Sequence, residues 1–359
     1  MTTIRDIYGI GYASDRIGLE LELESSKTQP LAWVDKQTMW AIHNDGSLRQ
    51  NGIEYVFRQP LWGGDIDAAL QLFEDNTKGI PFVDTGYGST HVHYNVGNLL
   101  VTEVMSIVVG WSILEDAFLT VCKPSRDGNN FAQRFNVLNS LSQTLVSSYG
   151  PSKRIDRLFA SISADYWKYS NLNIATIRTL GTVEFRPYHS TWDIKEIRSW
   201  IDRIVNFCKG MVAIGNPVQV LEFADRDLEA FITKYAGVPA TEQLIDLTRR
   251  NISTAFRLAY VVDEWEDVKS LRENPVKKVR SKKLPDGPIP GPPTFGSTPA
   301  AERTTVAGIS LPEVQARIAR ATERDRQVGE LLRQARERIQ VEQWTTGIDL
   351  NPTIRIGEL

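Results

Sequence analysis

Hydrophobic and polar positions alternate with a period of two in several segments of the first two hundred residues. The clearest is 18–24, which reads GLELELE, so that leucine and glutamate follow one another in turn. Successive side chains of a strand point to opposite faces, and this alternation therefore predicts strands with one apolar and one polar face. β-Branched and aromatic residues favour strands in the other segments. Strands are expected over 18–24, 53–58, 90–96 and 181–187.

Longer segments repeat their apolar positions at the spacing of a helix. In 194–213, Ile197, Ile201 and Ile204 fall on one face. The most apolar long segment, 99–122, carries three acidic residues, which favours a core helix over a membrane span. Helices are expected over 64–77, 99–121, 130–147, 152–162, 194–213, 217–236 and 240–263.

The pattern changes after about residue 270. Residues 270–308 hold the basic run KKVRSKK and then a Pro- and Gly-rich run, which predicts a linker or mobile loop. Residues 311–343 predict a long charged helix with a thin apolar face, which needs the body of the chain, a second copy or another protein as its partner. The expected division is a core over 1–215, a helical extension over 216–269, the linker over 270–308, and the charged helix with its tail over 309–359.

Composition narrows the classes of partner. The formal net charge of −3 indicates no general attraction to a membrane, and nothing in the sequence requires a nucleic-acid partner. Cys122 and Cys208 are the two cysteines and form no CxxC motif, which predicts reduced thiols. The N-terminus MTTIRDIYGI lacks the charged start and long apolar centre of a signal peptide. A cytoplasmic location is therefore expected.

The polar faces of the expected strands are rich in carboxylates. Glu20, Glu22 and Glu24 project from one face of their strand, because residues two apart point the same way. Asp45 in a DGS turn and Glu54 on the next expected strand offer two more carboxylates. Alternating Glu and Leu is, taken alone, most typical of the solvated face of an antiparallel sheet.

Two later strands repeat the same arrangement with other side chains. The HVH segment places His91 and His93 on one face, and the EFR segment does the same with Glu184 and Arg186. Carboxylates with a few imidazoles suit hard divalent cations such as Mg²⁺ or Mn²⁺. No cysteine accompanies them, so a structural zinc site is not expected.

Arg186 directs the choice of chemistry. A store of metal ions gains nothing from a guanidinium beside its acidic ligands, whereas a phosphate site uses its forked geometry. The absence of a GxxxxGK[ST] motif excludes a P-loop enzyme. Three classes stay open: an ATP-dependent ligase, a divalent-metal phosphohydrolase or nuclease, and a non-enzymatic virion or scaffold protein whose acidic face is only solvated.

Five segments in order resemble the amidoligase family: GLELE at 18–22, DGSL at 45–48, GIEYVF at 52–57, STHVHYNV at 89–96 and TVEFRPYHST at 182–191. These enzymes are ATP-dependent carboxylate–amine ligases related to glutamate–cysteine ligase and, more distantly, to glutamine synthetase. The resemblance covers roughly residues 8–210. It implies an α+β fold, in which a curved, mainly antiparallel sheet lines an active-site cleft and helices pack outside it, with a helical C-terminal region added here. It is also compatible with a bacterial or phage source.

The resemblance implies roles for individual residues. The matches to the family's metal ligands are Glu20, Glu22, Glu54, Glu184 and His93. His93 also matches the histidine near the nucleotide phosphates, and Arg186 matches the phosphate-binding arginine. Arg186, His93 and Glu54 are therefore the expected catalytic residues. Membership of the site is open for His91, Asp45 and Glu24.

The implied reaction joins an acid to an amine at the expense of ATP. A carboxylate attacks the γ-phosphate, two or three Mg²⁺ ions offset the negative charge, and an amine then attacks the acyl phosphate to give an amide or isopeptide bond. The substrates are a small-molecule or peptide acid and an amine. A lid is expected from 123–134 or from the basic segment 275–284. Arg126 and Arg134, in the first of these, are expected to bind ATP or the acid.

Overall fold

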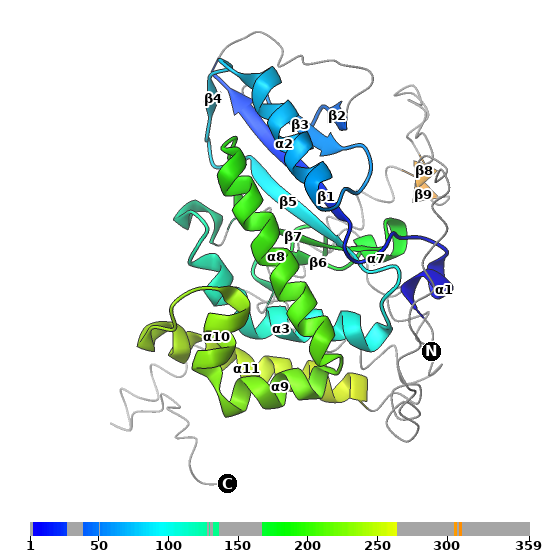
Figure 1. Ribbon diagram of the computed structural model, residues 1–359, viewed down its shortest axis with the longest axis vertical. Coiled ribbons are helices and arrows are strands. Elements are labelled where there is room, and N and C mark those ends of the chain that lie inside the picture. The colour runs from blue at the N-terminus through cyan, green and yellow to red at the C-terminus, as the bar shows by residue number, and fades with distance from the viewer. Residues whose placement is uncertain are drawn as a thin grey trace. The chain divides into compact units, whose positions relative to one another are not determined.

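An antiparallel sheet lies at the centre of the fold. The computed structural model of this chain orders six strands as β2-β3-β1-β5-β7-β6, with β4 joined to the end of β1, and all of these described pairs are antiparallel (Figure 1). The strands are Ile17–Ser25 (β1), Trp40–His43 (β2), Ile53–Phe57 (β3), Phe82–Val83 (β4), Ser89–Asn95 (β5), Leu172–Asn173 (β6) and Thr182–His189 (β7). The four expected strands are confirmed, as is the mixed class of helices with an open antiparallel sheet.

The structure describes residues 3–26, 39–49, 51–127, 129, 132–135, 167–263, 305–306 and 309–310. Its helices are Ile4–Tyr8 (α1), Gly64–Thr77 (α2), Val101–Leu119 (α3), Thr176–Thr179 (α7), Ile194–Ile214 (α8), Pro217–Arg226 (α9), Leu228–Ala236 (α10) and Glu242–Asp263 (α11), with a 3₁₀ turn at Pro124–Arg126 (η1). The expected helices over 130–147, apart from residues 132–135, and over 152–162 lie outside the described residues. So do the basic segment 275–284 and the charged helix over 311–343.

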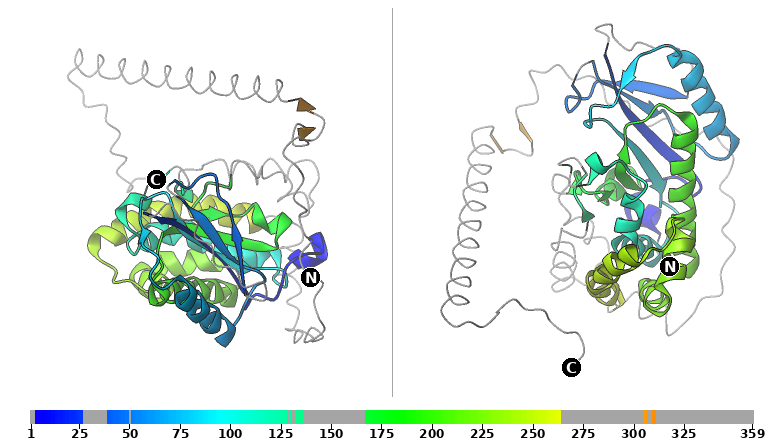
Figure 2. Two further views of the ribbon diagram at one scale, coloured as in Figure 1. Left: turned by 90° about the horizontal axis from the view of Figure 1, so that it is seen from above. Right: turned by 90° about the vertical axis from the view of Figure 1, so that its left-hand side faces the viewer.

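One face of the sheet is apolar and is covered by helices. Figure 2 shows α2 and α8 on the same side of the strands. Leu19 and Leu21 of β1 are fully buried, and Phe185 of β7 contacts the rings of Trp111 and Phe207 at centroid distances of 5.0 and 6.1 Å. Each such side chain contributes about 1.5–3 kcal/mol by leaving water. The helices thus take the leucine side of the alternation and leave the glutamate side for the opposite face.

Helix α3 is buried along nearly its whole length, against α8, α9 and α11, which confirms it as a core helix. Within the described residues, no single helix is long and apolar enough to cross a membrane; α8 and α9 meet that test of length and composition only as a pair, with a bend of 106° between them.

The expectation of one helix over 217–236 is wrong. The chain forms α9 and α10 instead, with Asp227 between them in a non-helical conformation (φ −148°, ψ 78°). The carboxylate of Asp227 accepts a hydrogen bond from the backbone N–H of Ala230 and so caps α10. A short acidic side chain that can bond to nearby backbone competes with a continuous helix, and here it starts a new one.

Separate segments cross closely at one end of the sheet, and the crossing depends on three glycines, Gly11, Gly97 and Gly181. Gly181, just before β7, has φ of +69°, and a Cβ added to it would lie 2.5 Å from the Cα of Gly11. We expect Gly181→Ala to lower the free energy of unfolding by about 2–4 kcal/mol, because the substitution combines a strained φ with a backbone clash. Chemical denaturation measures this. Gly64→Ala is the control. Gly64 has no positive φ and open space where a Cβ would lie, so the free energy of unfolding of this variant should differ little from that of wild type.

Contacts along the chain define two units, Met1–Leu284 and Pro285–Leu359. In the second, the described residues form a short antiparallel pair, Thr305–Val306 (β8) and Ile309–Ser310 (β9). The last residues of the expected linker therefore include a strand. The β-branched residues in TTVAGIS favour it.

Candidate functional site

Strand pairing brings the expected acids and histidines into one row across the sheet. Residues directly opposite one another in an antiparallel pair share a face. On one side of β1, Glu22 pairs with Glu54 of β3. On the other side, Glu20 pairs with His91 of β5. His93 in turn pairs with Glu184 of β7, so four strands contribute to a single polar face.

Glu20, His91 and Glu184 form the first group of possible metal ligands, the first triad. Their donor atoms lie within 4.8 Å of one another. His91 Nδ1 is 3.1 Å from Glu20 Oε2 and 3.4 Å from Glu184 Oε1. His93 lies beside this triad, with its Nε2 3.0 Å from Glu20 Oε1. Two carboxylates and one imidazole at this spacing match the ligand set of a divalent cation.

Glu22, Asp45 and Glu54 form a second group of the same kind, the second triad. Glu22 and Glu54 come from paired strands, whereas Asp45 lies in the loop between β2 and β3. In that loop Asp45 Oδ1 accepts a hydrogen bond from the N–H of Ser47 at 2.7 Å, in a local turn. The structure thus brings Asp45 and His91, whose membership was open, into the two triads.

Arg186 contacts the first triad and lines the same cleft as the second. Its guanidinium donates to Glu184 and approaches His91 Nδ1 at 3.4 Å. The charges of Glu184 and Glu22 both favour its charged form and, against the opposing effect of burial, raise its pKa. One cation is therefore built into the acidic face, next to the first triad.

Part of this face lines a cleft of about 450 Å³. The cleft is lined by Glu20, Glu22, Asp45, Glu54 and Arg186 and by the rim residues Tyr87, Lys168 and Tyr169. Tyr87 and Tyr169 are 42% and 38% exposed, and each ring is covered by a cation, from Arg49 and Lys168 respectively. Acids lie at the bottom of the cleft, and aromatic rings with basic side chains lie at its rim.

Several neighbours of the triads were not anticipated. The hydroxyl of Ser89 bonds to Glu22 and lies 2.6 Å from His91 Nε2, and so links the two triads. The amide of Asn173, on β6, donates to Glu184 Oε2 at 2.7 Å. Ser89 continues the alternation of His91 and His93, so the pattern itself offered a signal. β6 has only two residues, and its contact with β7 is beyond what local pattern predicts.

The charges in the first triad are balanced. Burial raises the pKa of Glu20, but His93 and His91 outweigh it and hold that pKa well below its usual range. Burial also raises the pKa of Glu184, and Arg186 and His93 outweigh it and lower that pKa. For His93, burial lowers the pKa, and the charges of Glu20 and Glu184 raise it overall. The acids here are ionised and are matched by cationic partners.

The second triad lacks positive charge. Burial, together with the carboxylates of Glu20, Glu22 and Asp45, raises the pKa of Glu54 to about 8. Glu54 therefore keeps a proton at neutral pH in the metal-free protein. A divalent cation supplies the positive charge that would ionise Glu54, and the residues present fit such an ion.

This proton makes the stability of the metal-free protein depend on pH. The folded state keeps it up to about pH 8, whereas the unfolded chain loses it near the ordinary value of 4.5. The folded state binds more protons in this range, so the free energy of unfolding should fall as pH rises, by about 2 kcal/mol given the partial exposure of Glu54. Urea denaturation at several pH values with a chelator measures the slope. Glutamine cannot titrate, so the free energy of unfolding of Glu54→Gln should depend less on pH than that of wild type. Equal slopes would contradict the raised pKa of Glu54.

Two expected residues do not line the described part of the cleft. Arg126 is 1% exposed and donates to the carbonyls of Arg186, at 2.9 Å, and Pro187, so it supports the backbone of strand β7. Arg134 is paired with Asp116 and Asp127. A role for either arginine in binding ATP or an acid stays a prediction.

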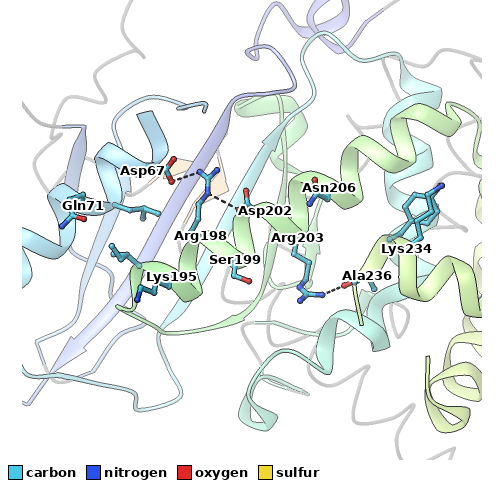
Figure 3. Close-up of a pocket in the computed structure, with 14 residues that line it drawn as sticks. Asp67, Gln71, Lys195, Arg198, Ser199, Asp202, Arg203, Asn206, Lys234 and Ala236 are labelled. Atoms are coloured by element: carbon cyan, nitrogen blue, oxygen red, sulfur yellow. Dashed lines mark hydrogen bonds and ion pairs between the residues drawn. The ribbon is translucent and has the colours of Figure 1, made fainter. Parts of the chain in front are cut away.

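A larger hollow, of about 690 Å³, lies between α2, α8 and α10 (Figure 3). Its arginines are already engaged: Arg198 pairs with Asp67 and Asp202, and Arg203 donates to the carbonyl of Ala236. Neither group of possible metal ligands found among the described residues lies there. The chemistry is therefore concentrated in the smaller cleft.

Comparison with known proteins gives no identification: no protein-family model matches the chain, and no curated protein matches it.

Proposed function

We propose that this chain is an ATP-dependent carboxylate–amine ligase of the amidoligase type. The observation that carries the proposal is the position of Arg186, which lines one cleft with the second triad and with Glu20 of the first, and whose guanidinium donates to Glu184 of the first. A site for bare metal ions has no use for a buried guanidinium, whereas a triphosphate needs cations on several sides. We propose further that the sheet corresponds to the catalytic sheet of glutamate–cysteine ligase and glutamine synthetase, with α2, α3 and α8 as its outer helices.

The two triads would each hold a Mg²⁺ ion, which would offset the charge of the triphosphate. Arg186 binds the oxygens of the phosphoryl group during its transfer to the carboxylate substrate. His93, next to Glu20, keeps that glutamate ionised and oriented. An amine then displaces phosphate from the acyl phosphate to form the amide bond.

The rim of the cleft suits the other end of a nucleotide. Tyr87 and Tyr169 are partly exposed aromatic side chains against which a base can pack, and Arg49 and Lys168 place positive charge beside them. A volume of about 450 Å³ lies within the range of small-molecule sites.

The test is nucleotide stoichiometry in a screen of amino acids and peptides against amines, with Mg²⁺ and ATP. A ligase releases ADP only when acid and amine are both present, and forms one amide per ADP. A metal-dependent phosphohydrolase instead releases phosphate without either partner, or cleaves nucleic acid. A protein whose acidic face is only solvated binds Mg²⁺–ATP no better than free carboxylates do, and that result would end the proposal.

A further inference from the structure

Glu24 lies on the same face of β1 as Glu20 and Glu22 but has different surroundings. It is 1% exposed and belongs to neither triad found among the described residues. Both of its oxygens are engaged by other segments. One accepts a hydrogen bond from the backbone N–H of Arg49, and the other accepts one from the hydroxyl of Thr85. The third glutamate of GLELELE therefore faces protein groups on both oxygens.

The two segments that Glu24 holds form a wall of the cleft. Arg49 lies in the loop that carries Asp45 of the second triad, and Thr85 lies in the loop that carries Tyr87 of the rim. The two loops also contact each other, because the guanidinium of Arg49 lies 5.1 Å from the ring centroid of Tyr87. Glu24 is thus a link between β1 and the two loops.

We propose that Glu24 is a positioning residue, which fixes the loop of Asp45 to β1 and so completes the second metal site. The inference rests on the metal binding in the proposed function. Asp45 needs such a support, since the turn with Ser47 fixes it only relative to its own loop. Glu22 and Glu54, by contrast, are fixed by the pairing of their strands. Groups that orient metal ligands typically change metal affinity about 10–100-fold when removed.

A ligand and a positioning residue respond in opposite ways to the same pair of substitutions. In Glu24→Gln the amide oxygen still accepts from Arg49, and the amide N–H₂ donates to Thr85, whose hydroxyl can accept as well as donate. Glu24→Asp keeps the charge but is one methylene shorter, so it does not reach both loops. If Glu24 is a positioning residue, metal binding at the second site survives Glu24→Gln and is weakened by Glu24→Asp. If Glu24 is a metal ligand, metal binding is weakened most by Glu24→Gln, which removes the charge.

The experiment is titration of the full-length protein with Mn²⁺ alone, followed by electron paramagnetic resonance. Wild type and Glu24→Gln are expected to bind two ions with similar affinities. Glu24→Asp and Glu24→Ala are expected to keep one site and to weaken the other about tenfold or more. Glu22→Gln is the matched control on the same strand, and it should lose the second site although it is also a Glu-to-Gln change.

Each other outcome overturns the inference in a distinct way. If Glu24→Gln behaves like Glu22→Gln, then Glu24 is itself a ligand. If Glu24→Asp and Glu24→Ala both keep two normal sites, the loop does not depend on Glu24. If wild type binds no Mn²⁺, the proposed metal site fails and this inference with it. Circular dichroism of each variant checks the fold, and Glu24→Asp serves where Glu24→Ala does not fold.

Discussion

Glu184→Gln is expected to reduce turnover about a thousandfold or more while the protein stays folded. Glu184 belongs to the first triad, accepts hydrogen bonds from Arg186 and Asn173, and lies 3.4 Å from His91. Glutamine has nearly the same shape but no charge, so a cation in this triad loses one of two carboxylate ligands. Arg186 loses its partner at the same time. The expected effect is large because one substitution disturbs both the metal and the phosphate-binding group.

The measurement is ADP release with the acid and amine found in the screen, alongside thermal unfolding. Glu222→Gln on α9 is the control, because it makes the same chemical change at an exposed position on the helical side. Its turnover should equal that of wild type. Unfolding of Glu184→Gln under conditions where Glu222→Gln is folded would show that Glu184 supports the sheet rather than the reaction.

Alternation, together with the content of β-branched and aromatic residues, predicted the strands that carry the site. In β1, β5 and β7 the polar side chains had to share a face, because a period of two leaves no other arrangement. The expected residues Glu20, Glu22, Glu54, His93, Glu184 and Arg186 do lie on one face. Which strand lies beside which was not contained in the local pattern. The resemblance implied only a mainly antiparallel sheet that lines one cleft, and the strand order comes from the structure.

The site residues that the sequence pattern did not predict are positioned by loops and by contacts between distant segments. Asp45 lies in a loop that is bonded to Glu24 of β1 through the backbone N–H of Arg49. Asn173, which donates to Glu184, lies on a strand of two residues. Arg134 is paired with Asp116 and Asp127, contacts that its loop sequence did not predict. Glycine- and asparagine-rich loops carry no periodicity, so their side chains cannot be assigned a direction from sequence.

The second large effect is expected for Arg186→Lys. Lysine keeps the positive charge but lacks the planar fork with which arginine binds two phosphate oxygens at once. At 8% exposure, the residue has little water to replace the lost hydrogen bonds. We expect kcat to fall about a hundredfold, with a smaller change in KM for ATP, because the guanidinium acts mainly on the phosphoryl group during transfer.

Steady-state kinetics at varied ATP concentration separate these two constants. Arg198→Lys is the matched control: that arginine is also paired with carboxylates, Asp67 and Asp202, but lies in the hollow between the helices. Its kinetics should be those of wild type. A rise in KM alone for Arg186→Lys would assign Arg186 to ground-state binding of the nucleotide. If kcat and KM are both unchanged, the phosphate does not bind at Arg186. The main argument for a ligase over a simple metal site would then fail.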